Sequence, residues 1–162
     1  MQNSISSPFG TEKDRYFMNK ALGQARKAYA LGEVPVGAVV VNSAGKIIAR
    51  GYNKTESLHS QTGHAEIQAL KKASKKIGNW RCQGLWVYVT LEPCPMCMHL
   101  LLLSRVSGVV FGAPSPVFGY RLDNATRLAV YQRDAMCIVD HGIEESAILL
   151  RSFFKQKRNE CE

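Results

Sequence analysis

Two short motifs constrain the fold of this chain most strongly, because their side chains form a site only if folding brings them together. They are His64-Ala65-Glu66 and Pro93-Cys94-Pro95-Met96-Cys97. Cys94 and Cys97 are three positions apart, so a helix that begins near Cys94 places both sulfur atoms on one face. With the His64 imidazole they supply three ligands of a tetrahedral zinc ion and leave the fourth position open for water. The pattern is typical of a catalytic zinc site.

Glu66 supports the catalytic interpretation, because it lies two positions after His64 and is not needed as a ligand. At the start of a helix it can reach the bound water and act as a proton shuttle. Each half of the pattern has an alternative: a lone Cys-x-x-Cys also occurs in redox pairs and in structural zinc sites. A structural site needs a fourth ligand, and the remaining residues offer no second close pair of His or Cys. We interpret His59 as a loop residue and expect His99 to point away from the cysteines. One zinc ion per chain is therefore predicted.

Composition limits the class of protein further. We expect residues 1–162 to form a single domain, with residues 1–10 disordered or loosely held. No apolar run approaches the ~20 residues that cross a bilayer, and the polar N-terminus contains no signal-peptide core, so a cytoplasmic location without membrane contact is expected. The five cysteines then read as two ligands and three thiols rather than disulfides. A net charge of +8 favours a polyanionic partner, although a basic surface alone proves none.

Hydrophobic periodicity predicts alternating helices and strands. The expected helices cover residues 11–32, 64–76, 94 onward, 123–131 and 143–158, and the expected strands cover 34–41, 46–51, 85–89, 106–112 and 136–139. Residues 53–63 and 113–121 are expected to be loops. The valine-rich run of the first strand indicates burial on both faces. This order predicts an α/β protein whose sheet is covered by helices on both sides.

Several side chains outside the two motifs have two open interpretations. The Asn53 amide can donate and accept at once, as recognition of a base requires, but Asn53 is equally suited to closing a turn. The lysines of residues 71–76 are more often a solvated helix face than an RNA contact. Phe153 and Phe154 continue an apolar stripe, so at least one should be in the core. Four consecutive leucines, residues 100–103, cannot all face one core, so another surface or a neighbouring element should cover some of them.

Beyond its separate motifs, the chain resembles the bacterial tRNA-specific adenosine deaminases of the cytidine-deaminase-like superfamily over nearly its whole length. The pattern His-x-Glu followed by Pro-Cys-x-x-Cys is the signature of zinc nucleobase deaminases. The matching segments are Glu33-Val34-Pro35-Val36-Gly37-Ala38-Val39, Tyr52-Asn53, His64-Ala65-Glu66-Ile67, Tyr88-Val89-Thr90-Leu91-Glu92-Pro93-Cys94-Pro95-Met96-Cys97, Val109-Val110-Phe111-Gly112-Ala113 and Phe153-Phe154-Lys155. The resemblance implies a three-layer α/β/α fold with a central mixed sheet of about five strands.

The resemblance also implies an activity and roles for particular residues. The implied enzyme is a homodimer that converts the wobble adenosine of a tRNA anticodon stem-loop to inosine. Zinc on His64, Cys94 and Cys97 would activate water, and Glu66 would transfer protons while hydroxide attacks carbon 6 of adenine. The substrate contacts implied are the amides of Ala65 and Cys94, the Asn53 side chain, Val34 and Pro35 in the pocket wall, and Phe154 and Lys155 on the last helix.

One segment departs from this family. After Gly112-Ala113 the family usually has an acidic, glycine-rich loop whose aspartate meets a ribose hydroxyl, whereas this chain has Pro114-Ser115-Pro116-Val117-Phe118-Gly119-Tyr120. Ser115 can take the place of the aspartate, and Phe118 or Tyr120 can offer a stacking surface for a splayed base. The alternatives to the implied function are a deaminase of a free guanine- or cytosine-type base or nucleoside, and a non-catalytic RNA-binding subunit. The presence of Glu66 argues against the latter.

Overall fold

A five-stranded mixed sheet forms the centre of the computed structural model, which describes residues 6–122 and 136–160. The strand order is β2-β1-β3-β4-β5, with bounds β1 Gly37–Val41, β2 Ile47–Tyr52, β3 Trp86–Leu91, β4 Gly108–Ala113 and β5 Cys137–Asp140. The α-helices are α1 Thr11–Ala30, α2 Thr55–Leu58, α3 Ala65–Ile77, α4 Pro95–Leu103 and α5 Glu144–Glu160, and the 3-10 turns are η1 Gln61–Gly63 and η2 Tyr120–Leu122. The helix predicted at residues 123–131 lies outside the described residues.

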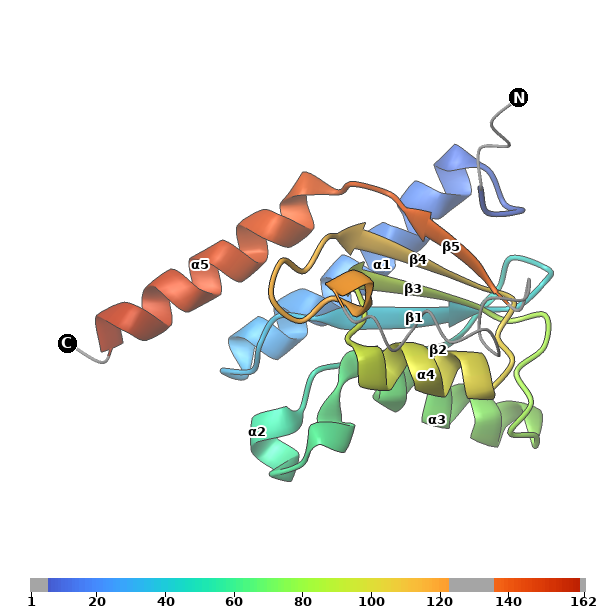
Figure 1. Ribbon diagram of the computed structural model, residues 1–162, viewed down its shortest axis with the longest axis horizontal. Helices are drawn as coiled ribbons and strands as arrows, with labels where there is room; N and C mark the ends of the chain where they lie inside the picture. Colours follow the sequence, from blue (N-terminus) through green and yellow to red (C-terminus); the bar gives the residue numbers. More distant parts are fainter. Residues whose placement is uncertain (1–5, 123–135, 161–162) are drawn as a thin grey trace.

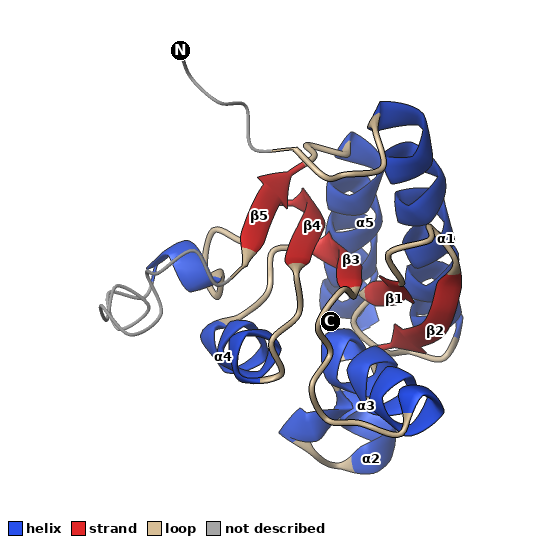
Figure 2. Ribbon diagram, turned by 90° about the vertical axis from the view of Figure 1, so that its right-hand side faces the viewer, coloured by secondary structure: helices blue, strands red, loops and turns tan. Residues whose placement is uncertain are grey.

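Helices cover both faces of the sheet, which confirms the predicted three-layer architecture (Figures 1 and 2). Helices α1 and α5 lie on one face, and α3 and α4 lie on the other together with the short α2. Every residue of β1 is buried, as expected for a strand covered on both sides. None of the helices in the described part of the chain is long and apolar enough to cross a membrane.

Strand direction decides where the functional segments meet. Strands β2 and β3 are both antiparallel to β1, and β4 and β5 continue parallel to β3, so these four strands run the same way. Their carboxyl ends therefore lie together at one end of the sheet, which we call the carboxyl end. The segments that follow β2, β3 and β4 carry Asn53, the cysteine motif and the loop of residues 114–121. The residues just before β1 reach the same end, because β1 runs in the opposite direction.

Three local features differ from the sequence predictions or refine them. The predicted loop 53–63 contains α2 and η1, and β1 begins at Gly37 because Val34 and Val36 form a tight turn ahead of it. Part of the N-terminal segment expected to be loosely held is packed: the Ser7 hydroxyl donates to Asp14, and the Phe9 ring contacts Phe17. Buried polar groups and aromatic rings thus fix the approach to α1.

The last helix separates its two phenylalanines as expected. Phe153 is 6% exposed and packs edge-on against Tyr29 of α1, whereas Phe154 is 46% exposed. An ion pair between Arg26 and Glu145 also joins the two helices. Helix α5 therefore packs against α1 from Glu145 to Gln156 and projects beyond the sheet at its carboxyl end (Figure 1).

Candidate metal and active site

The proposed metal ligands come from the first residues of two helices. His64 immediately precedes α3, and Cys94 immediately precedes α4, where Pro95 occupies the first helical position that suits proline. Cys97 follows within the first turn of α4. Helix α3 can approach β2 closely because Gly51 has no side chain: a Cβ there would lie 2.4 Å from the Ala65 carbonyl oxygen. The packing of both helices on the sheet thus brings the two motifs together.

The three donor atoms have the spacing that a tetrahedral zinc ion requires. The Nδ1 atom of His64 lies 3.6 Å from the Cys94 sulfur and 3.5 Å from the Cys97 sulfur, and all three donors lie within 4.8 Å of one another. Zn–N bonds near 2.0–2.1 Å and Zn–S bonds near 2.3 Å, at a tetrahedral angle, give an N···S separation of about 3.6 Å. One imidazole and two thiols are also the soft, mixed donor set that zinc prefers. The residues therefore fit the metal.

The sulfur atoms are placed to become thiolates. Hydrogen bonds from the Cys97 thiol and from His64 lower the pKa of Cys94 to about 4, whereas the bond to Cys94 and burial raise the pKa of Cys97. The amino-terminal end of α4 adds the positive end of a helix dipole. Among the described residues, Cys82 and Cys137 are also free thiols.

Glu66 is a buried acid beside the three ligands. Its side chain is in the first turn of α3, is 4% exposed and interacts with His64 and with the Cys97 thiol. Burial raises the pKa of this carboxyl group to about 7. A carboxyl group with this pKa can both accept and return a proton near neutral pH. The geometry thus suits proton transfer at a metal-activated water.

Asn53 belongs to a hydrogen-bonded group around a buried acid, Glu33, just before β1. The Glu33 carboxylate accepts from the Asn53 amide nitrogen at 3.3 Å and from the backbone amides of Glu56 at 3.1 Å and Ser57 at 2.8 Å. Burial by itself would raise the pKa of Glu33, but the amides of Ser57 and Glu56 outweigh it and hold the pKa below its usual value of 4.5. We call Glu33, Asn53, Glu56 and Ser57 the Glu33 network.

The Glu33 network stands next to the metal ligands. The backbone amide of Lys54 donates to the Gly63 carbonyl oxygen at 2.8 Å, and these two residues directly adjoin Asn53 and His64. Because a carboxylate only accepts hydrogen bonds, Glu33 fixes the amide nitrogen of Asn53 on its own side. The Asn53 oxygen in turn accepts from the Thr55 hydroxyl at 2.9 Å. Both interpretations of Asn53 from sequence therefore stay compatible with its position.

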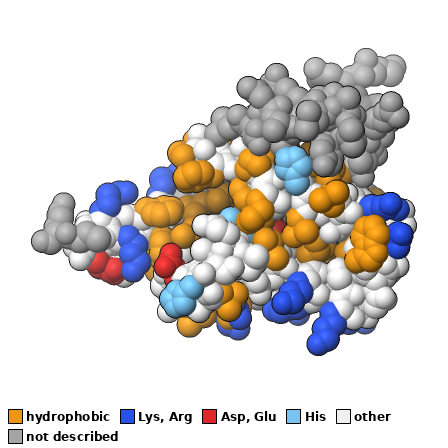
Figure 3. All heavy atoms as spheres, turned by 60° about the horizontal axis from the view of Figure 1, so that its bottom comes forward, with side chains coloured by type: hydrophobic (Ala, Val, Ile, Leu, Met, Phe, Trp, Pro, Cys, Tyr) orange, Lys and Arg blue, Asp and Glu red, His pale blue; other side chains and the backbone are white. Residues whose placement is uncertain are grey.

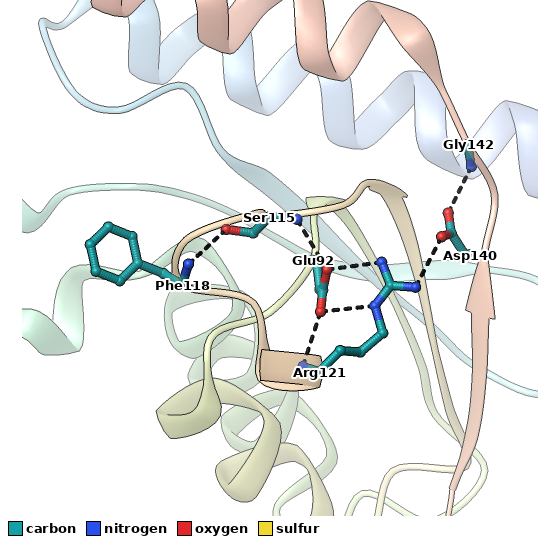
Figure 4. A network of polar contacts seen from close by, with 6 residues as sticks. All are labelled: Glu92, Ser115, Phe118, Arg121, Asp140 and Gly142. Carbon is teal, nitrogen blue, oxygen red and sulfur yellow. Dashed lines mark hydrogen bonds and ion pairs between the residues drawn. The ribbon is translucent and has the colours of Figure 1, made fainter. Parts of the chain in front are cut away.

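On the other side of the cysteine motif, Glu92 holds the loop of residues 114–121 (Figure 4). Its carboxylate is buried and accepts from the backbone amides of Ser115 at 3.0 Å and Arg121 at 3.1 Å. The Arg121 guanidinium adds a two-pronged contact to both carboxylate oxygens and reaches Asp140 of β5 at 3.4 Å. Burial would raise the pKa of Glu92, but Arg121 and the Ser115 amide lower it. We call Glu92, Ser115, Arg121 and Asp140 the Glu92 network.

The remaining predicted site residues occupy different settings. Val34 is half-buried, and Pro35 and Ala65 are buried near the carboxyl end of the sheet. The Ser115 hydroxyl accepts from the Phe118 amide at 3.3 Å, so it supports its own loop. Phe154 and Lys155 are exposed on α5. His59 ends α2, and the His99 ring contacts the Pro95 carbonyl oxygen, so the part of the chain described places neither in the metal-ligand group.

Sequence reasoning missed the roles of Glu33, Glu92 and Arg121. A signal was present for the first two, because each carboxylate adjoins a buried strand and a charge there needs a partner. For Glu33 the partners are backbone amides, which sequence cannot display. For Glu92 the partner is a cation far along the chain, at the end of a loop that shows no periodicity.

Comparisons with known proteins agree with this geometry. Residues 11–113 match the family described as cytidine and deoxycytidylate deaminase zinc-binding region. The tRNA-specific adenosine deaminase of Bacillus subtilis (strain 168) is 40% identical over 148 residues, which cover 90% of this chain and 91% of that protein. The chloroplastic tRNA(adenine(34)) deaminase of Arabidopsis thaliana is 50% identical over 106 residues, but these cover 65% of this chain and only 8% of the plant protein.

Solved structures give the same assignment of fold. A structure from work on A-to-I editing by tRNA:A34 deaminases at the wobble position of transfer RNA superposes with a TM-score of 0.71 at 36% identity, covering 84% of this chain and 99% of that chain. A guanine deaminase from Bacillus subtilis gives a TM-score of 0.58 at 33% identity, covering 62% of this chain and 64% of that chain. The resemblance inferred from the motifs is confirmed. The chain belongs to the cytidine and deoxycytidylate deaminase zinc-binding family and, within it, to the tRNA-specific adenosine deaminases.

Proposed function

We propose that this protein hydrolyses the wobble adenosine of a tRNA anticodon stem-loop to inosine, with release of ammonia, using one zinc ion per chain. The observation that carries the proposal is the buried Glu66 carboxylate beside three donor atoms at zinc spacing. A non-catalytic RNA-binding subunit has no use for such an acid. The choice of adenosine in tRNA rests on the names of relatives that match almost the whole chain.

Each residue of the site has a chemical role in this reaction. His64, Cys94 and Cys97 would hold the zinc ion, which when bound would supply a nucleophilic water at neutral pH. Glu66 would take one proton from the water as its oxygen forms a bond to carbon 6 of adenine, and would pass this proton to the ring nitrogen. It would then carry the second proton, from the new hydroxyl group on carbon 6, to the amino group, which leaves as ammonia when the C6–N bond breaks. The backbone amides of Ala65 and Cys94 steady the oxygen.

Substrate residues surround this centre. Asn53 hydrogen-bonds the base, held in one orientation by Glu33, and Val34 and Pro35 line the pocket next to it. The target base must leave its stack to reach the pocket, which costs a few kcal/mol, so contacts outside the pocket must offset that cost. Phe154 and Lys155 on the exposed part of α5 and the loop that carries Ser115 provide them. Lys155→Ala should lower the salt slope of stem-loop binding by about one unit or less. An unchanged slope would remove Lys155 from the RNA contact.

We also propose a cytoplasmic homodimer. Viewed from the side of α2, α3 and α4, the molecule shows hydrophobic side chains across the middle of the face and Lys and Arg around its margin (Figure 3). In the leucine run only Leu101 is fully buried, whereas Leu103 and Met96 of the same helix are exposed. A partner subunit would cover them. Sedimentation that finds only monomer at working concentrations would contradict this assembly.

The deciding experiment measures inosine in a transcribed anticodon stem-loop after incubation with the purified protein. Free adenosine and free guanine serve as competing substrates, because the guanine deaminase similarity keeps a free purine as the second candidate. We expect inosine in the stem-loop and little product from either free compound. Glu66→Ala should retain zinc and the folded structure but lose activity by roughly 10²–10⁴-fold or more, since proton transfer alone contributes that much. Rapid turnover of guanine with unmodified RNA would overturn the proposed substrate.

A further inference from the structure

The loop of residues 114–121, which follows β4, exposes a large aromatic ring. Phe118 is 75% exposed, and its neighbour Val117 is also exposed. Single exposed apolar side chains are common on protein surfaces and need no explanation by themselves. Phe118 differs from such residues in that the loop around it is anchored at both ends. The Glu92 carboxylate is the anchor for both.

The anchoring holds the Phe118 backbone in a defined position (Figure 4). Glu92 binds the amide of Ser115 ahead of the ring and both the amide and the guanidinium of Arg121 after it. Inside the loop, the Phe118 amide donates to the Ser115 hydroxyl at 3.3 Å, and the Gly119 amide donates to the Ser115 carbonyl oxygen at 3.2 Å. A Cβ at Gly119 would lie 2.5 Å from the Glu92 carboxylate, so only glycine fits there without a shift. The ring is thus presented by a preorganised loop.

The loop is also tied directly to the cysteine motif. The Tyr120 amide donates to the Pro93 carbonyl oxygen at 2.9 Å, and Pro93 immediately precedes the ligand Cys94. Both segments follow parallel neighbouring strands, β3 and β4, at the carboxyl end of the sheet. The loop that carries the exposed ring is therefore hydrogen-bonded to the segment that leads directly into the metal site.

We propose that Phe118 stacks on the base of a nucleotide adjacent to the target adenosine. The inference rests on the proposed function and names a contact for that function. When a base is turned out of its stack, the base beside it loses a neighbour, and an aromatic side chain can replace that neighbour. Base–aromatic stacking is worth ~1–3 kcal/mol and tolerates any base. A flat apolar ring without a charge or a hydrogen-bonding group in its side chain suits this role, and the net charge of +8 favours the polyanion that would bring the base.

Substitutions of the ring test the contact through binding and kinetics. Phe118→Ala and Phe118→Leu both remove the aromatic plane, and the leucine variant keeps apolar volume in case the alanine variant perturbs the loop. We expect each to raise KM and Kd for the stem-loop by about 5- to 150-fold, the range that corresponds to the loss of one stack, with a much smaller change in kcat. Phe118→Trp keeps an aromatic plane and should bind the stem-loop about as well as the wild type. The matched control is Tyr16→Ala, which removes an exposed aromatic ring from α1 and should leave both constants unchanged.

A cycle of paired changes identifies the partner base. The nucleotide on the 5′ or the 3′ side of the target is replaced by an abasic residue, and each RNA is measured with wild-type protein and with Phe118→Ala. If Phe118 stacks on one of these bases, removing that base and introducing Phe118→Ala should cost less binding free energy together than the sum of the two separate costs. At the other flanking position the two costs should add. 2-Aminopurine at the same position should be quenched on binding wild-type protein and less quenched by Phe118→Ala.

The outcomes separate this inference from the proposed function. Inosine formed by the wild type, with additive losses at both flanking positions, would overturn the role of Phe118 and leave the function intact. Full binding by Phe118→Leu would do the same. Failure of the wild type to form inosine in the stem-loop would overturn the function first, and the stacking proposal with it.

Discussion

Two buried carboxylates at the carboxyl end of the sheet, Glu33 and Glu92, hold the two sides of the site by different means. In the Glu33 network every partner is uncharged: two backbone amides and the Asn53 side chain. In the Glu92 network two backbone amides are joined by the guanidinium of Arg121, which is 45% exposed and also reaches Asp140. Both acids have a lowered pKa. For Glu33 the cause is hydrogen bonds from uncharged amides, and for Glu92 the main cause is the Arg121 guanidinium.

The difference teaches which property each side controls. Hydrogen bonds to neutral donors are directional and short in range, so the Glu33 network fixes the orientation of one side chain, Asn53. An arginine fork is strong and fits a carboxylate in two places, so the Glu92 network can hold a whole loop across three strands. The Glu92 network is partly open to solvent, so its contribution to stability should fall as the salt concentration rises. The contribution of the Glu33 network should not depend on salt. This contrast can be tested by substitution.

The largest effect is expected for Glu92→Ala. This substitution removes the acceptor of two backbone amides and leaves Arg121 with only its exposed partner. Removing one partner of a buried charged pair destabilises a protein by up to several kcal/mol, but the exposure of Arg121 makes this cost smaller. We therefore expect the free energy of unfolding to fall by about 2–3 kcal/mol. Urea denaturation measures it. The loop should also loosen, so KM for the stem-loop should rise as it does for Phe118→Ala.

Salt provides the control for this substitution. The stability difference between wild type and Glu92→Ala should narrow as sodium chloride is raised from low concentration to about 1 M, where the screening length falls to about 3 Å. A difference that stays constant would mean that the backbone amides, and not the guanidinium, carry the contribution of Glu92.

A smaller effect is expected for Glu33→Gln, which keeps the shape but replaces one acceptor oxygen by a donor. One of the three donors then faces an NH2 group, so about 1–2 kcal/mol of unfolding free energy should be lost. The loss should be independent of salt. Because the Ser57 amide alone uses one of the two Glu33 oxygens, it is the donor that loses its acceptor, and the turn of α2 next to Asn53 should loosen. KM for the stem-loop should therefore rise while zinc content stays unchanged. A salt-sensitive loss, or an unchanged KM, would contradict the role given to Glu33.

These two networks also mark the boundary of what sequence could predict. Ligand spacing predicted His64, Cys94 and Cys97 because short-range helix geometry governs it, and periodicity predicted the five strands because burial repeats along each of them. Helix α2 was missed because a single turn has no periodicity and its first amides bond to Glu33, far away in the chain. For Phe153 and Phe154, sequence could predict only that at least one is buried. Which of the two is buried depends on how α5 packs against α1, and the apolar pattern does not show this.

The smallest effect is expected in the dependence of stability on pH in the acidic range. A carboxyl group whose pKa is lowered in the folded state stabilises the fold fully above its unfolded value, and this stabilisation is lost as the pH falls through the lower, folded value. Glu33 and Glu92 both have this sign, so stability should decline below the ordinary value of 4.5. Glu33→Gln and Glu92→Gln should each flatten that decline in urea titrations. Because their hydrogen-bond partners are different residues, the double variant should flatten it by the sum. A non-additive result would show that the two sides are coupled.

The common direction of β2, β3 and β4 has a consequence for protein engineering. Chemistry and recognition are carried by separate segments that start from neighbouring strands, so the loop after β4 can be exchanged for another sequence without altering the helices that carry the metal ligands. Glu92, which anchors the loop, sets the condition for a successful graft. The incoming loop must have a cation at the position of Arg121 and a glycine at the position of Gly119. A loop that meets both requirements can present a new surface to RNA while the reaction centre stays as it is.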